Sequence, residues 1–509
     1  MKRWILGIGL AFGLAACSTP PAPPHYHPVA ETSAPLDANP ADIQVLNRIS
    51  WGANTISAQL LRVDGLKRTI HRQLHPSDDD GLPAAAAAQI AEMDISRKSP
   101  AELDDELKAL RDTVQKTKGT PEVEAARKAY QERLTSLARE AAARSLLRDL
   151  YSRNQLKEQL VWFWMNHFNV SQNKGEIRAL VGDYEENAIR PHVLGKFRDL
   201  LAATAFHPAM LQYLDNAQNA AGHINENYAR EIMELHTMGV GSGYTQTDVQ
   251  ELARILTGLG IDRGGKGRNV EHIGELTAFH HKRHDYGDKH FLGTTIGGTG
   301  LAEIDQALTI LSRQPATARF ISTKLAQYFC CDRVPDTLVA AMAETFRETD
   351  GDIAAVLETL FASPEFTASL GQKFKDPIHY SVSALRLAYG DTVILNPQPL
   401  LNWLDRSGEP LYRHETPDGY PLAEADWSAP GQMETRFEIA RAIASGRNGL
   451  FRTLDEPKEP APPPDIAKTR LYAAMLPRLR PATVTALSAA KTPVEWNTLF
   501  LSSPDFMRR

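Results

Sequence analysis

The chain has 509 residues, with 56 lysines and arginines against 62 aspartates and glutamates, and a formal net charge of −6 at pH 7. Charges of both signs are interspersed, which excludes the basic surface of nucleic-acid-binding proteins, so we expect no nucleic-acid partner. Three cysteines are too few for a disulfide-stabilised scaffold, and the length allows a large hydrophobic core of two or three packed subdomains.

The first 16 residues have the features of a secretory signal peptide. Lys2 and Arg3 precede an apolar run from Trp4 to Leu14, which is too short to cross a bilayer as a helix. The run ends in Leu-Ala-Ala directly before Cys17, which resembles the bacterial lipobox. That resemblance implies cleavage before Cys17 and acylation of this cysteine. The alternative is an ordinary signal peptide with a chance cysteine.

The residues after Cys17 determine the expected location of the protein. Several acyl chains on one residue anchor a protein stably, so we expect the lipidated Cys17 to bind a membrane. Ser18, where aspartate would stand in a retained lipoprotein, resembles lipoproteins sorted to the outer membrane of a two-membrane cell. Residues 17–40 are rich in proline and alanine and predict a tether. We therefore expect a lipid-anchored cell-envelope protein with its globular part at residues 41–509.

The globular part is predicted to be mainly α. Helical periodicity dominates, and no alternation of strands and helices indicates a parallel sheet. Residues 84–153 consist largely of strong helix formers and predict a helical-hairpin insertion, broken near Gly119. Residues 395–431 are rich in proline, glycine and aromatics and predict an irregular aromatic loop. A small irregular or β element is expected near residues 270–300.

Cys330 and Cys331 are adjacent in the sequence. Either they form a strained vicinal disulfide or they are free thiols at a helix end. The Cα atoms of neighbouring residues are closer than in ordinary disulfides, which favours free thiols.

The densest run of polar functional groups lies between Asn225 and Gly258. We expect one helix that begins at Asn225, a glycine-rich turn, and a second helix that begins at Thr245. Asp248 is placed to complete a capping box with Thr245. The apolar residues that follow recur at helical spacing and predict one buried face.

The first helix of this pair carries rows of charged and amide side chains. Glu226, Arg230 and Glu234 are spaced to form one row of ion pairs. Asn227 and Glu231 belong to an adjacent polar stripe, and His236 points to a different side of the helix. These rows are either a solvated face or part of a site.

A second polar group stands among aromatics in LVWFWMNHFNV, where Asn166 and His167 follow two tryptophans. Either His167 is a core histidine with a satisfied ring, or both side chains line a cavity. A neutral imidazole in a cavity suits acid–base chemistry or metal ligation.

The segment FHHKRHDYGDKH concentrates possible metal ligands. Polar and apolar residues alternate, so a strand would place His280 and His284 on one face. Histidine with a carboxylate, here His284 and Asp285, fits zinc or another divalent transition metal. No spacing in the segment is diagnostic of a metal site.

Ordered blocks along the chain resemble the bacterial family called domain of unknown function 1800. The resemblance is carried by LNRISWG (46–52), FWMNHF (163–168), NENYAREIMELHTMGVGSGYTQTDVQELARILTG (225–258), HDYGDKHFLG (284–293), PATARFISTKLAQYF (315–329) and PDGYP (417–421). It covers nearly everything after residue 40. It implies no established reaction. It does imply a partner, because such genes often neighbour those of a secreted, sulfatase-like family.

Two functions fit these patterns. One is an envelope enzyme that uses metal-assisted or acid–base chemistry on an unknown substrate, with Glu231 as base or metal ligand, Arg230 as anion clamp and His284 as ligand or acid. The other is a non-catalytic lipoprotein that binds or positions the sulfatase-like partner. For the enzyme, the candidates are Glu231, Arg230, His167 and His236 for catalysis, His284 and Asp285 for a metal, and Asn166, Asn225 and Asn227 for binding.

Replacing Cys17 with alanine is expected to release the protein from membranes, because it removes the thiol that would be acylated. Membrane fractionation and the mass of the N-terminal peptide after feeding a labelled fatty acid measure the effect. Cys331→Ala is the matched control and should leave the label in place. A Cys17→Ala protein that stays acylated would contradict the lipobox interpretation.

Overall fold

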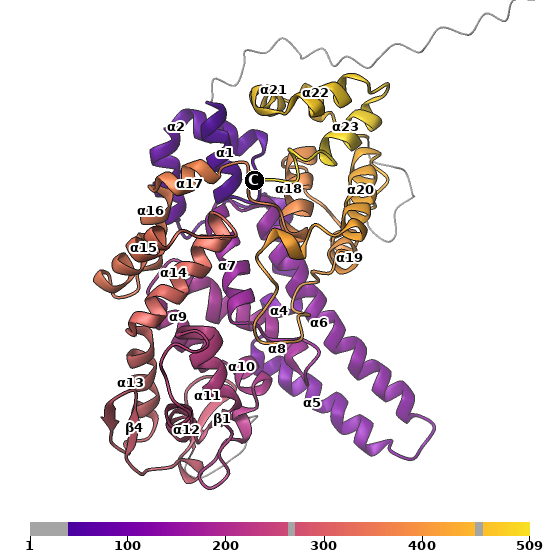
Figure 1. The fold of residues 1–509 in the computed structure, drawn as a ribbon. Coiled ribbons are helices and arrows are strands. Elements are labelled where there is room, and N and C mark those ends of the chain that lie inside the picture. Colours follow the sequence, from indigo (N-terminus) through magenta and orange to yellow (C-terminus); the bar gives the residue numbers. More distant parts are fainter. Residues whose placement is uncertain (1–38, 263–269, 453–461) are drawn as a thin grey trace, which may run out of the picture.

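The computed structural model describes residues 39–262, 270–452 and 462–509, and the chain is mainly α-helical, as predicted. Figure 1 shows a tall helical body with small antiparallel sheets at its lower end, the small β element that the sequence predicts. Cys17, with the expected signal peptide and most of the tether, lies outside the described residues. Among the helices described, none combines the length and apolar character that a membrane span requires.

The centre of the body is α7 (Gln155–His167), which is buried on nearly every side. All of its residues except Lys157 are buried. A helix without a solvated face is stable only inside a core. The elements packed against it are α1 (Pro40–Ile49), α2 (Thr55–Leu74), α6 (Val123–Tyr151) and the π-helix η1 (Tyr184–Ile189).

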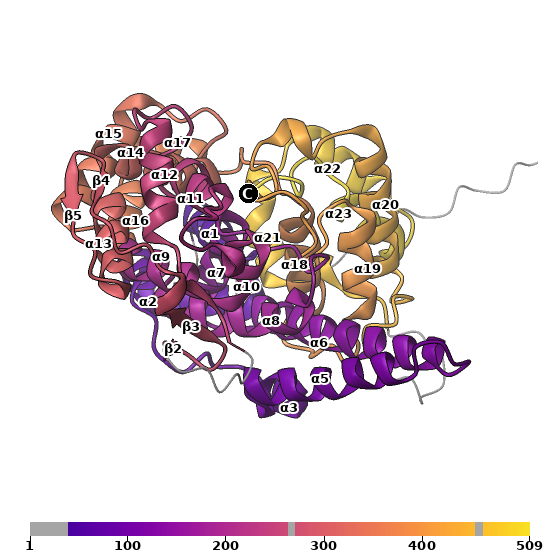
Figure 2. The same cartoon turned by 90° about the horizontal axis from the view of Figure 1, so that it is seen from below.

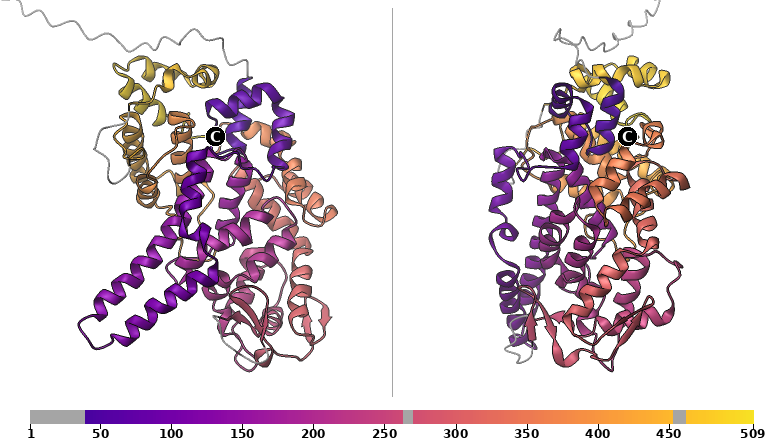
Figure 3. Two further views of the ribbon diagram at one scale, coloured as in Figure 1. Left: turned by 180° about the vertical axis from the view of Figure 1, so that it is seen from behind. Right: turned by 90° about the vertical axis from the view of Figure 1, so that its left-hand side faces the viewer.

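Helices α5 (Pro100–Lys116) and α6 form a hairpin that projects from the body (Figures 1 and 3). α3 (Ala84–Glu92) and α4 (Asp94–Arg97) precede it and contact α6. Leu103, Leu107, Leu134 and Leu137 of the hairpin form a small apolar cluster with Ala179 of the following helix, α8 (Ile177–Asp183).

A chain of short helices leads from α7 to the polar hairpin of the sequence. These are α8 (Ile177–Asp183), η1, η2 (Arg190–His192), α9 (Phe197–Ala205), α10 (Pro208–Tyr213) and η3 (Asn216–Gln218). Next come α11 (Asn227–Glu231), which continues into the π-helix η4 (Ile232–Thr237), and α12 (Gln246–Ile255). The predicted capping box between Thr245 and Asp248 is confirmed, as is the buried apolar face of α12.

Two small sheets follow. β1 (Leu259–Ile261), β3 (Thr277–His280) and β2 (Val270–His272) form an antiparallel sheet in the order β1-β3-β2, and β4 (Lys289–Phe291) pairs with β5 (Thr294–Ile296). The prediction of a strand that places His280 and His284 on one face is wrong. β3 ends at His280, and the 3₁₀ turn η5 (His281–Arg283) rotates the chain before His284.

The remaining helices cover two sides of α7, which Figure 2 separates in the view from below. One side has α13 (Leu301–Ser312), α14 (Pro315–Phe329), α15 (Asp336–Glu348), α16 (Ile353–Phe361) and α17 (Pro364–Ser369). The other has α18 (Pro377–Tyr389), α19 (Gln398–Arg406), η6 (Glu424–Asp426), α20 (Pro430–Ala444), η7 (Ile466–Lys468), α21 (Arg470–Met475), η8 (Leu476–Arg478), α22 (Pro481–Ser488) and α23 (Pro493–Leu501).

Helix α19 lies inside the stretch 395–431 that was expected to be irregular throughout. Leu400, Trp403 and Leu404 recur at helical spacing and are buried. The prolines and glycines around them obscured this short pattern in the sequence. Residues 407–423 do form an irregular loop, which packs on the end of α7.

A buried arginine joins the first helix to the final residues of the chain. Arg48 on α1 is fully buried and donates to the carbonyl oxygens of Phe329 (2.7 Å), Ser369 (2.6 Å) and Arg509 (2.6 Å), and to the Ser369 hydroxyl (2.8 Å). Burial lowers the pKa of Arg48 to about 9. Residues 505–509 thereby lie beside α1 and α18, where the C label stands in Figure 1.

Cys330 and Cys331 are free thiols, as the sequence favours. Cys330 is the buried C-cap residue of α14, and Cys331 is half-buried. Their sulfur atoms are 2.8 Å apart. The hydrogen bond from Cys331 lowers the pKa of Cys330 to about 7.

Arg48→Met is expected to lower the free energy of unfolding by about 3 kcal/mol or more, because the backbone carbonyl groups of Phe329, Cys330, Ser369 and Arg509 lose a buried donor. Urea unfolding followed by circular dichroism measures the change. Arg68→Met, an exposed position on α2, is the matched control and should stay within about 0.5 kcal/mol of wild type. Equal effects of the two substitutions would contradict a central role for Arg48.

Candidate functional site

The hairpin that the sequence singles out is held together by its own polar side chains. Arg230 donates to Glu226 and Glu234, each at 3.3 Å, so the predicted row of ion pairs is present. Asn225 accepts from the backbone of Asn227 at 3.0 Å and donates to the Asp215 carbonyl. These side chains cap and brace α11, a structural use of groups expected to bind a ligand.

The π-helix η4 was not predicted. A π turn inserts one extra residue per turn and is frequent at functional sites. Here it buries His236 completely, and burial lowers the pKa of His236 to about 3. Its backbone carbonyl lies 3.0 Å from His167 Nε2, so this atom of His167 carries a hydrogen.

His167 and Asn166 have different surroundings. His167 is buried among Phe163, Phe168 and Phe320, and burial, followed by the nearby Lys324, holds its pKa well below the ordinary value. Asn166 pairs its carboxamide with the backbone of Tyr420, at 2.6 Å to N–H and 2.9 Å to the carbonyl. Asn166 therefore fastens the 407–423 loop to α7.

The loop packs so closely that only glycine fits at one position. A Cβ atom at Gly419, where φ is +73°, would lie 2.2 Å from the Asn166 carbonyl oxygen. The cavity beneath the loop has a volume of only about 30 Å³, enough for about one water molecule. Asn166 thus does not face a substrate-sized space there.

Glu231 lies at the rim of this region, half-buried. Burial, followed by the Glu234 carboxylate, raises the pKa of Glu231. Asp418 on the 407–423 loop adds to this effect. Glu231 is thus the one predicted catalytic residue with a partly exposed carboxyl group and a raised pKa.

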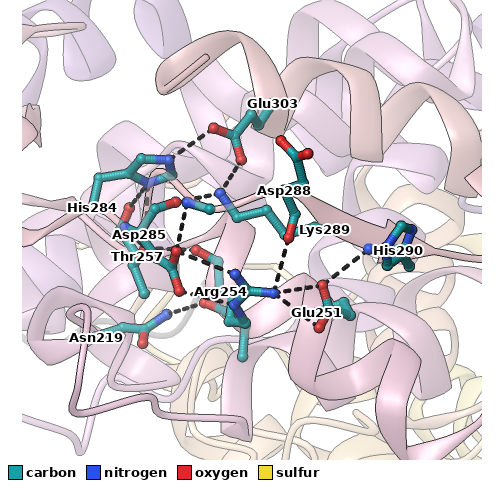
Figure 4. A network of polar contacts seen from close by, with 12 residues as sticks. Asn219, Glu251, Arg254, Thr257, His284, Asp285, Asp288, Lys289, His290 and Glu303 are labelled. Atoms are coloured by element: carbon teal, nitrogen blue, oxygen red, sulfur yellow. Dashed lines mark hydrogen bonds and ion pairs between the residues drawn. The ribbon is translucent and has the colours of Figure 1, made fainter. Parts of the chain in front are cut away.

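His284 and Asp285 belong to a separate buried network, drawn in Figure 4. His284 Nδ1 lies 2.7 Å from the Thr257 carbonyl, and Nε2 lies 3.0 Å from Glu303 Oε1. Lys289 forms an ion pair with the other Glu303 oxygen, and the side chains of His284, Glu303 and Lys289 are fully buried. Both ring nitrogens of His284 are therefore occupied by protein groups.

Asp285 points to a different partner. Arg254 donates to both of its carboxylate oxygens, at 2.8 Å and 3.2 Å, and this contact lowers the pKa of Asp285. His284 and Asp285 thus do not converge on one point. Across residues 39–262, 270–452 and 462–509, no group of three or more His, Cys, Asp and Glu side chains is placed to hold a metal ion.

The predicted residues therefore form three groups with separate partners rather than one assembled site. A larger space lies elsewhere: a cavity of about 580 Å³ between α1, the Gly52–Ala53 turn, α18, η8 and residues 505–509. Its wall carries five cations and, within the described part of the chain, one acid: Lys375, Arg478, Arg480, Arg508, Arg509 and Asp505.

Lys375 and Ser383 lie in the wall of this cavity, although both are largely buried. Lys375 Nζ lies 3.0 Å from Ser383 Oγ and 3.7 Å from the centre of the Phe506 ring. Burial, followed by the Arg509 and Arg436 guanidinium groups, holds the pKa of Lys375 well below its ordinary value.

Sequence reasoning missed this cavity because its wall comes from segments far apart in the chain. Lys375 stands in an unremarkable KFKDP turn before α18, and the arginines follow in RLR and MRR at 478–480 and 507–509. The only available signal was clustering of basic residues near two chain segments. Nothing local indicates that these segments meet.

A family model described as "Protein of unknown function (DUF1800)" matches residues 44–508. The chain belongs to this DUF1800 family. No curated protein and no solved structure matches it.

His284→Ala is expected to lower the free energy of unfolding by about 2–4 kcal/mol, since Glu303 and the Thr257 carbonyl lose a buried partner. Bound metal per chain, from elemental analysis, should not change. His290→Ala is the control, because His290 is exposed and its ring contacts the hydroxyl of Thr295 on the neighbouring strand. Loss of a stoichiometric metal on His284→Ala would restore the metal-site hypothesis.

Proposed function

We propose that this DUF1800 protein is a lipid-anchored protein of the cell envelope that binds an anionic ligand in the cavity between α1, α18 and residues 505–509. The observation that carries the proposal is the excess of cations over carboxylates in the cavity wall. The volume suits a small ligand. Guanidinium groups bind carboxylate, phosphate and sulfate through paired hydrogen bonds.

One of the cations, Arg478, is available to a ligand. Arg480 has Asp505 at 3.4 Å, and Arg508 forms an ion pair with Glu424, so both are partly neutralised. Arg478 is exposed and has no carboxylate partner among the described residues. An anion in the cavity would supply the missing counter-charge, which a low-dielectric wall makes favourable.

The position of the cavity supports a function near a membrane. Pro40, the first residue of α1, belongs to the cavity wall. An acylated Cys17 would therefore hold the cavity on the side of the body that is tethered to the bilayer. The anion is then either a soluble molecule or a lipid headgroup.

The expected secreted partner suggests which anion to test first. The resemblance implies a partner from a sulfatase-like family of unknown function, and sulfate is a suitable probe of the cavity because it is a small anion that guanidinium groups bind. The proposed function therefore combines an anionic ligand with the binding or positioning of the sulfatase-like partner.

Arg478→Gln is expected to weaken sulfate binding about 5–10-fold, because one guanidinium contact with an anion is lost. Isothermal titration calorimetry of the full-length protein in detergent measures the affinity. Arg441→Gln, an exposed position on α20 outside the cavity, is the matched control and should bind as wild type.

Vesicles distinguish the two sources of the anion. The Cys17→Ala protein is sedimented with vesicles that contain anionic lipid and with neutral vesicles. Binding to the anionic vesicles alone, abolished by Arg478→Gln, would identify the ligand as a lipid headgroup. Sulfate binding without vesicle binding would identify it as a soluble anion. Absence of both would refute the proposal.

A further inference from the structure

Lys375 and Ser383 form a pair whose geometry goes beyond anion binding. The Lys375 amine has two neighbours, the Ser383 hydroxyl and the face of Phe506. Ser383 is in the middle of α18 and also lies 3.1 Å from the Tyr380 carbonyl. A hydroxyl rotates freely, so its hydrogen can point to either neighbour.

The surroundings of Lys375 favour the unprotonated amine. The side chain is only 6% exposed, and two guanidinium groups, Arg509 and Arg436, lie near it. No carboxylate of the described residues is within ion-pair distance of its Nζ. Desolvation and neighbouring cations both favour the neutral form of a lysine, which can act as a base.

We infer that Ser383 is a nucleophile and Lys375 its general base, so that the cavity hydrolyses esters that carry a negative charge. The inference rests on the proposed anion site for the charged part of the substrate, whereas the serine–lysine pair itself rests on its own geometry. The serine–lysine arrangement is a known variant of serine nucleophile activation.

The reaction balances with water as the only co-reactant. Ser383 Oγ forms a bond to the ester carbonyl carbon while its proton passes to Lys375 Nζ. The carbon–oxygen bond to the alcohol then breaks, and the alcohol takes the proton from the lysine. Water, deprotonated by the same amine, attacks the acyl-serine and releases the acid, which regenerates Ser383.

The backbone of Gly52 packs directly against Ser383. A Cβ atom at Gly52, where φ is +107°, would lie 2.6 Å from Ser383 Cβ, so only glycine allows this contact. Asn47 also belongs to the cavity wall. Its carboxamide oxygen accepts from the Ala53 N–H at 2.8 Å and fixes the turn that contacts Ser383.

A fluorophosphonate probe tests the pair directly. We expect stoichiometric phosphonylation of Ser383 in the full-length protein, located by peptide mass mapping. Ser383→Ala should abolish the label, and Lys375→Met should slow labelling at least about 100-fold, the range of general-base assistance. Ser381→Ala is the matched control, since Ser381 is buried on the same helix and is not in the cavity wall.

A wild-type protein without label at Ser383 would overturn the inference, and so would a Lys375→Met protein labelled at the wild-type rate. The wild-type peptide map decides the first point even if Lys375→Met fails to fold. Hydrolysis of mono-4-nitrophenyl succinate, an anionic ester, is the second readout and should be lost in Ser383→Ala.

The same proteins separate this inference from the anion site. Sulfate binding is measured on the wild-type protein beside the labelling. Sulfate binding without labelling would support the anion site and contradict Ser383 as a nucleophile. Labelling without sulfate binding would support Ser383 as a nucleophile and contradict the anion site.

Discussion

The buried guanidinium group of Arg48 is the contact on which the arrangement of the chain ends depends. It joins α1 to the end of α14, to the end of α17 and to Arg509. Arg509 continues the link, because it donates to Gln159 on α7 and to the Tyr328 carbonyl. Five N–H donors in a fixed plane allow arginine to satisfy several carbonyl groups that no helix or strand can pair.

The same device recurs elsewhere in the core. Arg386 donates to the carbonyls of Gly52 and Leu150, and Arg436 donates to that of Lys375. Burial lowers the pKa of Arg386 and of Arg436 to about 10, which shows how strongly these charges are desolvated. Their donors replace the water that the loop carbonyls lose on folding.

This network also creates the cationic cavity. Residues 505–509 run antiparallel to 373–375, with a bridge between Phe374 and Arg508. Phe506 is thereby placed over Lys375, and Arg509 beside it. The cavity thus has positive charge because arginines from distant segments meet at one wall. A desolvated charge without a partner costs free energy, and a bound anion would offset this cost.

The sequence by itself determined what depends on local spacing. The mainly α class, the Thr245 capping box, the Glu226–Arg230–Glu234 row and the free thiol at Cys330 all follow from residues within one or two helical turns. Local spacing failed where packing overrides it, as in the π turn of η4, in α19 and at the end of β3. There a short pattern competes with contacts from distant segments.

Only the tertiary structure decided which polar residues share a space. His167, Glu231 and His284 stand out in the sequence because of their neighbours, yet the fold gives each of them separate partners. Lys375, Ser383 and Arg478 have no local signature, and the cavity that unites them exists because a buried arginine brings α1 and residues 505–509 together. The sequence determines which chemical groups the side chains carry. The burial of apolar surface and the pairing of buried polar groups determine which segments, hundreds of residues apart, lie close together.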